Sequence, residues 1–365
     1  MCCVSMAIVF FVLPLPPYKG LKKYRISLRL LAGAYLVMAV LKSVVMMWNV
    51  AVVNLISIET LAIASLQAPL FAFSLVVLIN PRFITKRYLC KHLLPTLVFT
   101  VLYILVALRC GSPKIFDFIG LKAMALHPSM LVREIFLAYY VFQLIFLSRL
   151  FQVQAKKYED RLDNYFADHL RLYLPGLRYS FYAALLVGVC TLLSCFMFTG
   201  IMILIFNVTY TVFYLAFGIY YIQYPHKFEN IHQVIYPAPI MAEELPRSNK
   251  RFDWEELKSR IIADRYYIVP GINIEQMAQR LKVGRTTLSN FINNEEKMKF
   301  NAWIGLLRVE DAKRLLVEYP QCSVAEIAEQ VGYSELSNFS RQFKLITSLS
   351  PSAWRQEQLK KSDLL

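Results

Sequence analysis

The residue types that could carry redox, metal or nucleophilic chemistry are scattered along this chain of 365 residues. The five histidines show no paired metal spacing, and the seven cysteines include no C-x-x-C pair. An enzyme needs His, Asp, Glu or Cys side chains that converge on one site. The sequence therefore predicts no enzyme, no metal and no cofactor, and it predicts that the cysteines are reduced and structural: Cys2, Cys3, Cys90, Cys110, Cys190, Cys195 and Cys322.

A repeated polar pattern near the C-terminus points instead to helices with defined starts. In Asn273-x-x-Gln276 and Ser323-x-x-Glu326, a capping side chain is followed three residues later by an amide or carboxylate that can return the hydrogen bond. The two patterns lie 50 residues apart. The apolar residues after them also match: Ile274, Met277, Ala278 and Leu281 in the first copy, and Val324, Ile327, Ala328 and Val331 in the second.

In each copy a short turn leads to a second helix with its own apolar stripe. The turns are Lys282–Gly284 and Gly332–Ser334, and the stripes are Leu288, Phe291 and Ile292, then Phe339 and Phe343. This arrangement predicts two helix-turn-helix units in tandem. Further helices are predicted by a capping box before the units, helical spacing between them and a cap after them: Asp253-x-x-Glu256, Phe300–Glu318, and Ser350-Pro351 leading to Ala353 and Trp354.

Three segments of this region resemble the DNA-binding domain of the AraC/XylS family of bacterial transcription activators. They are Arg308–Leu316 (RVEDAKRLL), Val324–Ser334 (VAEIAEQVGYS) and Ser337–Lys344 (SNFSRQFK), followed by Ser350-Pro351. The resemblance covers about residues 253–357, and the second unit is its more specific half. The first unit departs at Gly284, where a Ser or Thr commonly caps the recognition helix, and at Ile292, where an aromatic residue is common.

The resemblance implies that each recognition helix enters the major groove of double-stranded DNA, and that RNA polymerase is a partner. It places Thr286, Ser289 and Asn290 on the exposed face of the first helix, and Ser337, Asn338 and Arg341 on that of the second. Arg341 is the candidate for a bidentate guanine contact, and Asn290 and Asn338 for adenine, each contributing about 1–3 kcal/mol of discrimination. Arg285 and Lys344 are candidate phosphate contacts. Tandem units would read major-groove segments about 34 Å apart.

The rest of the chain has the composition of a membrane protein. The sequence is 57% hydrophobic, with a net charge of +15, and most of the basic excess lies before residue 250. A helix needs about 20 apolar residues to cross a bilayer. Residues 179–226 contain no Lys, Arg, Asp or Glu, which predicts two crossings with a turn near Thr199-Gly200. Four earlier spans are predicted at about 30–48, 61–79, 93–108 and 130–148.

The basic residues predict the orientation of these spans, because Lys and Arg near a span resist translocation. Fifteen of them fall in the first, third and fifth connections and three in the alternate connections. The domain after residue 222 is therefore expected in the cytoplasm. Residues 1–15, which end at a proline group, are either a short first span or a truncated start. The total is thus seven spans with the N-terminus outside, or six with it inside.

Few ionisable residues fall within the spans, and such residues are candidates for function. They are Lys42, Glu59, Arg133 and Glu134, which could form a ligand pocket near the outer leaflet. Snorkelling and local pairing explain them equally well. After the last span, residues 223–251 contain four prolines, which predicts a semi-extended linker rather than a rigid helix.

The predicted fold is all-α: a transmembrane bundle (1–222), a linker (223–251), a domain of two helix-turn-helix units joined by a linker helix (252–357) and a tail (358–365). The resemblance implies a one-component regulator of the membrane-anchored type, located in the bacterial inner membrane. A small-molecule or envelope signal and a homodimer are candidate partners. The alternative is a transporter or channel-like bundle with an autoregulatory DNA-binding tail, but only Pro69 and Pro95 interrupt the spans.

Overall fold

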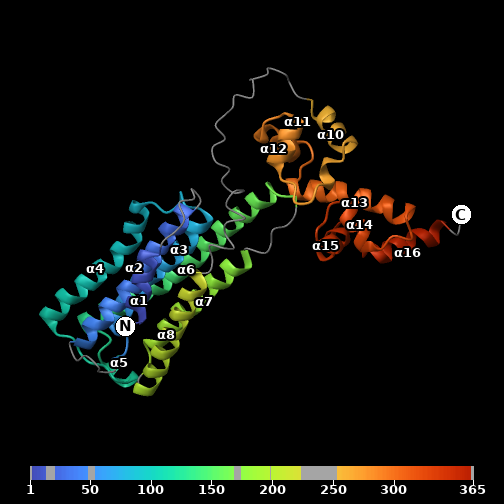
Figure 1. Cartoon of the computed structure of the whole chain (residues 1–365). Helices are drawn as coiled ribbons and strands as arrows, with labels where there is room; N and C mark the ends of the chain where they lie inside the picture. Colours follow the sequence, from blue (N-terminus) through green and yellow to red (C-terminus); the bar gives the residue numbers. More distant parts are fainter. Residues whose placement is uncertain are drawn as a thin grey trace. The chain divides into compact units, whose positions relative to one another are not determined.

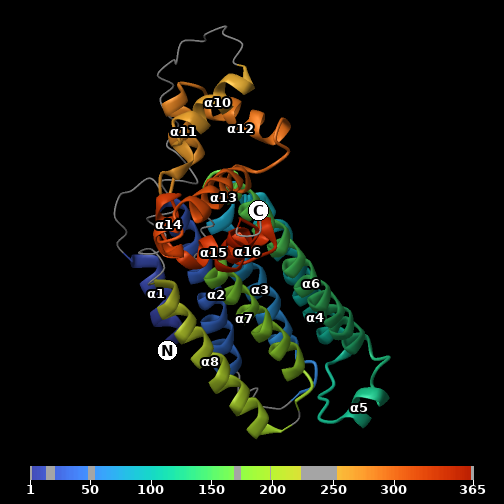
Figure 2. The same ribbon diagram turned by 90° about the vertical axis from the view of Figure 1, so that its right-hand side faces the viewer.

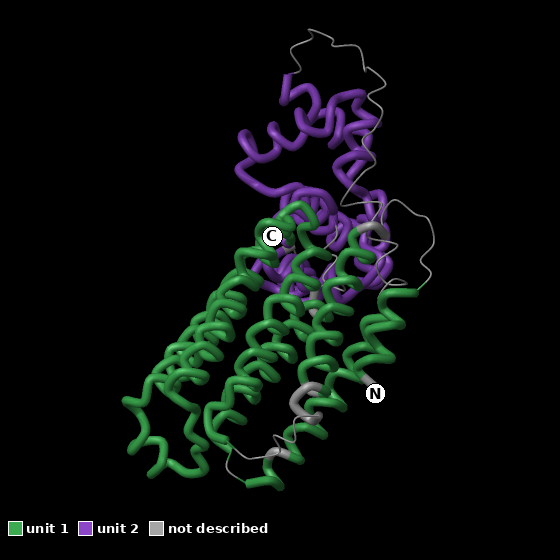
Figure 3. The backbone as a smooth tube through the Cα atoms, turned by 90° about the vertical axis from the view of Figure 1, so that its left-hand side faces the viewer, with its two compact units in different colours: residues 1–158, 172–232 green, residues 159–171, 233–365 purple. Residues whose placement is uncertain are grey.

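The computed structural model describes residues 2–13, 21–47, 54–167, 174–197, 199–222 and 253–362. Within these ranges every regular element is a helix, apart from one isolated bridge between Phe166 and Asn273. The all-α prediction is therefore confirmed. The chain divides into two compact units, one of residues 1–158 and 172–232, and the other of residues 159–171 and 233–365 (Figure 3).

The first unit is a bundle whose long helices run alongside one another (Figures 1 and 2). Six of its helices are long and apolar enough to cross a membrane. Its helices are α1 (Cys2–Val12), α2 (Leu21–Met47), α3 (Ile58–Ile79), α4 (Lys86–Cys110), α5 (Phe118–Ala123), α6 (Pro128–Asp163), α7 (Leu174–Ser194) and α8 (Gly200–Ile222).

These helices match the predicted spans in number but differ in extent. The predicted break near Thr199-Gly200 is present, since α7 ends at Ser194 and α8 begins at Gly200, and both helices are long and apolar enough to span a membrane. Helix α4 begins at Lys86 and α6 continues to Asp163, so both exceed the predicted 93–108 and 130–148. Polar flanks continue these helices, whereas a hydropathy pattern marks only their apolar centres. At 11 residues, α1 is about 16 Å long, which is shorter than a bilayer core.

The second unit is built on α13 (Phe300–Glu318), with helices gathered at both of its ends (Figure 1). Trp303 and Ile304, in its first half, belong to one apolar core, while Ala312 and Leu316, in its second half, belong to another. The first core takes in α10 (Trp254–Ala263), η1 (Tyr266–Ile268), α11 (Ile274–Leu281) and α12 (Arg285–Asn294). The second takes in α14 (Val324–Gln330), α15 (Leu336–Thr347) and α16 (Pro351–Ser362).

Two of the three predicted capping boxes are present. The Gln276 amide N–H donates to Asn273 Oδ1 at 2.9 Å, and the Gln276 side chain accepts from the Asn273 N–H at 3.2 Å. Ser323 and Glu326 make the same pair of bonds. The third prediction is wrong in detail, because Asp253 caps α10 by accepting from the Glu255 N–H, one residue earlier than a capping box requires.

Candidate DNA-binding interface

Helix α12, the second helix of the first helix-turn-helix unit, has one buried and one exposed face. Leu288 and Ile292 are buried in the first core. Arg285, Thr286 and Asn290 are exposed on the other face. Ser289 is half-buried and accepts a hydrogen bond from Asn293 at 3.2 Å. The N-cap Gly284 provides no side-chain cap, so the Arg285 end of the helix retains free N–H groups that suit a phosphate.

Helix α15 presents the corresponding face of the second helix-turn-helix unit. Phe339 and Phe343 are fully buried, while Ser337, Arg341 and Lys344 are exposed and Asn338 is half-buried. The eight residues predicted to contact DNA thus lie on α12 and α15, and both helices turn their apolar stripes into the cores. This is the amphipathic pattern that a recognition helix needs.

Hydrogen bonds along α15 pre-position three of these side chains. Asn338 Nδ2 donates to a Glu335 carboxylate oxygen at 3.1 Å, and Arg341 donates from Nη2 to Asn338 Oδ1 at 2.8 Å. Ser337 also donates to Glu335, at 3.4 Å. Sequence reasoning missed Glu335. The signal that could have found it is the i, i+3 spacing of Glu335, Asn338 and Arg341, which places the three on one helix face.

The turn before α15 depends on a glycine. Gly332 has φ +94°, and a Cβ at this position would lie 2.2 Å from the Ile268 carbonyl oxygen. The first unit has Lys282 at the matching position, with φ +57°. Both turns therefore contain a residue with positive φ, and the second turn lies against the backbone of η1 at Gly332.

A buried arginine connects the two helix-turn-helix units. Arg308 of α13 is 1% exposed and donates from Nε to the Tyr267 carbonyl at 2.7 Å and from Nη2 to the Val269 carbonyl at 3.0 Å. Its guanidinium carbon also lies 5.1 Å from the centre of the Tyr333 ring, in the turn of the second unit. Arg308 therefore holds the η1 segment of the first unit and the turn of the second on one helix.

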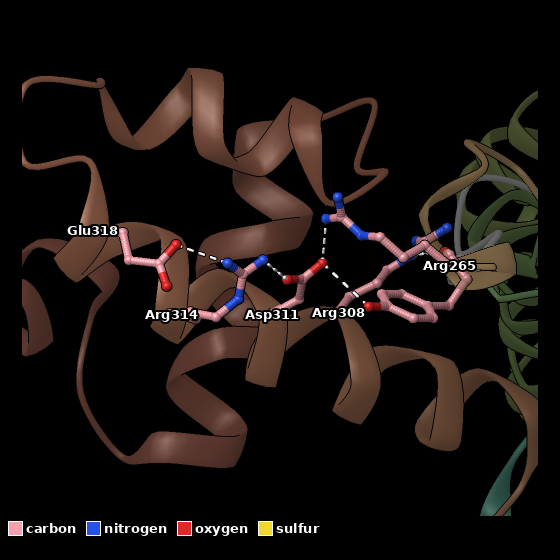
Figure 4. A network of polar contacts seen from close by, with 6 residues as sticks. Arg265, Arg308, Asp311, Arg314 and Glu318 are labelled. Atoms are coloured by element: carbon pink, nitrogen blue, oxygen red, sulfur yellow. Dashed lines mark hydrogen bonds and ion pairs between the residues drawn. The ribbon is translucent and has the colours of Figure 1, made fainter. Parts of the chain in front are cut away.

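Asp311 extends this network along α13 (Figure 4). Its carboxylate accepts from Arg265, from the Tyr267 hydroxyl at 3.2 Å and from Arg314 at 3.0 Å. Arg314 also pairs with Glu318 at 2.7 Å. The hydrogen bond to Asp311 raises the pKa of Arg265. With α13 fixed to both units, their separation is fixed as well.

The residues predicted to form a membrane sensor site belong to the helical bundle, the first of the two compact units. Arg133 is 1% exposed and donates to Tyr103 Oη at 2.7 Å, Ser112 Oγ at 2.6 Å and Asn54 Oδ1 at 3.3 Å. Glu59 and Glu134 are half-buried. Lys42 lies on α2, but its side chain is outside the described residues. The acceptors found for Arg133 are thus neutral groups that sequence reasoning did not name.

The comparisons with known proteins match the second compact unit, which contains both helix-turn-helix units. Residues 277–357 match a family described as a helix-turn-helix domain. The Msm operon regulatory protein of Streptococcus mutans serotype c is 30% identical over 86 residues, which are 24% of this chain and 31% of that protein. Regulatory protein PocR of Salmonella typhimurium is 28% identical over 86 residues, 24% of this chain and 28% of that protein.

The uncharacterized HTH-type transcriptional regulator YtdP of Bacillus subtilis is 29% identical over 87 residues, 24% of this chain and 11% of that protein. The chain therefore spans less than a third of the length of these relatives. No solved structure matches it. The matched residues run from α11 to α16 and include both recognition helices. Residues 277–357 of this chain are accordingly an AraC-type helix-turn-helix domain.

Proposed function

We propose that this protein is a membrane-tethered, sequence-specific transcription regulator. The observation that carries the proposal is the pairing of two helix-turn-helix units on one helix, α13, with a polar exposed face on each recognition helix. Arg341 and Asn338 would read base edges from α15, and Thr286, Ser289 and Asn290 from α12. Ser337 would face the bases beside Asn338 and Arg341, while Arg285 and Lys344 would contact phosphates and set the register.

The membrane part of the proposal is supported by the exposed apolar surface of the helical bundle. Large apolar side chains lie uncovered within it, including Leu105 on α4 (60% exposed) and Leu204 on α8 (63% exposed). Exposed apolar surface on this scale is stable in lipid rather than in water. Together with the basic connections, it supports a multi-pass protein of the bacterial inner membrane whose DNA-binding domain lies in the cytoplasm.

In this proposal the bundle of residues 1–222 acts as sensor or anchor, and residues 223–251 connect it to the DNA-binding domain. A small molecule or an envelope signal would change the packing or the oligomeric state of the bundle. The bound domain would then change how RNA polymerase uses the promoter. Residues 223–251 lie outside the described residues, so the linker stays a prediction.

Chromatin immunoprecipitation of the full-length protein, compared with an Arg341→Ala variant, tests this function. Loss of a bidentate base contact should weaken specific binding about 5- to 140-fold, so the promoter peaks should shrink or disappear. Lys360→Ala, in the last turn of α16, removes the same charge outside the recognition helices and should leave the profile unchanged. Identical profiles for wild type and Arg341→Ala would mean that α15 does not read DNA.

A further inference from the structure

The end of α6 and the residues after it pack with the DNA-binding domain. Residues 159–167, here called the α6 tail, belong to the second compact unit, whereas α6 up to residue 158 belongs to the first (Figure 3). Phe166 and Ala167 are 8% and 2% exposed, and Ala167 belongs to the first apolar core of the DNA-binding domain. The tail is therefore an integral part of that unit.

Backbone hydrogen bonds join the α6 tail to the start of α11. Phe166 and Asn273 form an antiparallel bridge, in which the Ala167 N–H donates to the Ile272 carbonyl at 3.0 Å. The Ile274 N–H donates to the Tyr165 carbonyl at 2.9 Å. Ile274 is the first residue of α11, and its N–H has no acceptor within the helix. The tail thus satisfies a donor that the helix-turn-helix unit leaves open.

The side chain of Tyr165 contacts both helices of the first unit. Its hydroxyl donates to Glu275 Oε2 of α11 at 2.6 Å. Its ring centre lies 5.7 Å from the guanidinium carbon of Arg285, the first residue of α12. Burial and the bond to Glu275 raise the pKa of Tyr165, so the hydroxyl stays protonated and able to donate. A single side chain therefore touches the candidate phosphate contact of the first recognition helix.

Carboxylates of the α6 tail hold the start of α13. Lys299 pairs with Asp160 and, at 3.5 Å, with Asp163, whose other oxygen accepts from Asn301 Nδ2 at 3.0 Å. The bond to Asp160 raises the pKa of Lys299. The tail therefore places carboxylates beside Lys299 and an aromatic ring beside Arg285, and both cations carry the charge that attracts DNA phosphates.

We propose that the α6 tail is an intramolecular clamp that competes with the DNA backbone for the first helix-turn-helix unit. Because the tail is the continuation of α6, the same contacts carry a change in α6 to α11 and α12 directly, without passing through residues 223–251. Release of the clamp frees Arg285 and Lys299 for phosphates, whereas a held clamp leaves the second unit to bind DNA alone. This inference rests on the proposed function and names the regulation of its DNA-binding surface.

A disulfide between Phe166→Cys and Asn273→Cys tests the clamp in the full-length protein in detergent. The two residues form the non-hydrogen-bonded pair of the bridge, for which the Cα atoms lie about 4.5 Å apart, within the range a disulfide spans. The probe is a duplex of about 30 base pairs selected by the wild-type protein from a random library, which is long enough for two major-groove segments.

The oxidised double variant should bind this duplex about tenfold more weakly than the same preparation after reduction, because the locked state can no longer be exchanged for the released one. Phe166→Cys alone and Asn273→Cys alone each carry one of the two substitutions, so neither can form the new disulfide and neither should respond to oxidation. Equal binding by the oxidised and reduced double variant, or tighter binding when it is oxidised, would overturn the clamp.

A second variant, Tyr165→Leu, removes the ring and its hydroxyl without a covalent lock. It should bind the duplex about 2- to 30-fold more tightly, the range that corresponds to one cation–π contact. Tyr165→Phe keeps the ring over Arg285 and should stay closer to wild type. Tyr165→Leu binding equal to or weaker than wild type, with unchanged amide exchange in α11, would contradict the proposal.

The two levels of the proposal fail differently. If Arg341→Ala binds the selected duplex as tightly as wild type, the proposed function itself is wrong. If Arg341→Ala loses binding but the disulfide and Tyr165→Leu change nothing, the protein reads DNA and the α6 tail is only a structural part of the domain.

Discussion

Replacing Gly332 with alanine is expected to unfold the second helix-turn-helix unit and to abolish DNA binding. The new Cβ would lie 2.2 Å from the Ile268 carbonyl oxygen and 2.6 Å from its carbon, both backbone atoms. The residue would also have to keep φ near +94°, which disfavours alanine. Together these effects should cost about 4 kcal/mol. Hydrogen exchange of the full-length protein should show lost protection of α14 and α15 amides.

Gly284→Ala is the control glycine substitution in the first helix-turn-helix unit, at the N-cap of α12. Gly284 has φ −69°, and an added Cβ would meet only Thr287 Oγ1, at 3.4 Å. The change should cost about 1 kcal/mol or less, as for an alanine at a helix N-cap. Equal loss of protection in the two variants would show that contact with η1 does not constrain the second turn.

Arg308→Met is expected to destabilise the DNA-binding domain by about 3–5 kcal/mol, because two charge-assisted hydrogen bonds and a cation–π contact are lost together. The Tyr267 carbonyl would lose its bond to the guanidinium, and the Tyr333 ring would lose its cation–π contact with Arg308. Since this residue joins the two units, protection should fall in η1 and in the turn before α15. Affinity for the selected duplex should fall as well, because the separation of the units is no longer fixed.

Arg314→Met tests whether burial is what matters. Arg314 also contributes to the Asp311 network, but its side chain is 53% exposed. Exposed ion pairs contribute about 0–1 kcal/mol, so this variant should stay close to wild type. If Arg308→Met and Arg314→Met had the same effect on exchange and on DNA affinity, Arg308 would not be the residue that couples the units.

Much of the DNA-binding domain could be predicted from the sequence because its signals are local. A capping box spans four residues, so Asn273 and Ser323 mark the starts of α11 and α14 without any knowledge of tertiary contacts. The apolar stripes of α12 and α15 are equally local. The Asp253 box failed in detail because Asp253 bonds to Glu255, a choice between neighbouring amides that the pattern leaves open.

The contacts that organise the site could not be predicted, because they join distant residues. Tyr165 and Glu275 are 110 positions apart, and Lys299 and Asp160 are 139 apart. No local pattern marks such a pair. The predicted span at 130–148 also concealed that α6 continues to Asp163 and enters the DNA-binding unit. The role of Arg308 was missed for the same reason, since its acceptors lie about 40 positions earlier.

Hydroxyl-radical footprinting of the full-length protein on the selected duplex measures the central claim, that two linked units read DNA together. Two protected stretches are expected on one face of the duplex, about one helical turn apart. Arg341→Ala should weaken both protected stretches through the shared loss of affinity, and most strongly the stretch under α15. Protection of a single stretch by the wild-type protein and by its reduced clamp variant, or no protection at all, would contradict a tandem reader.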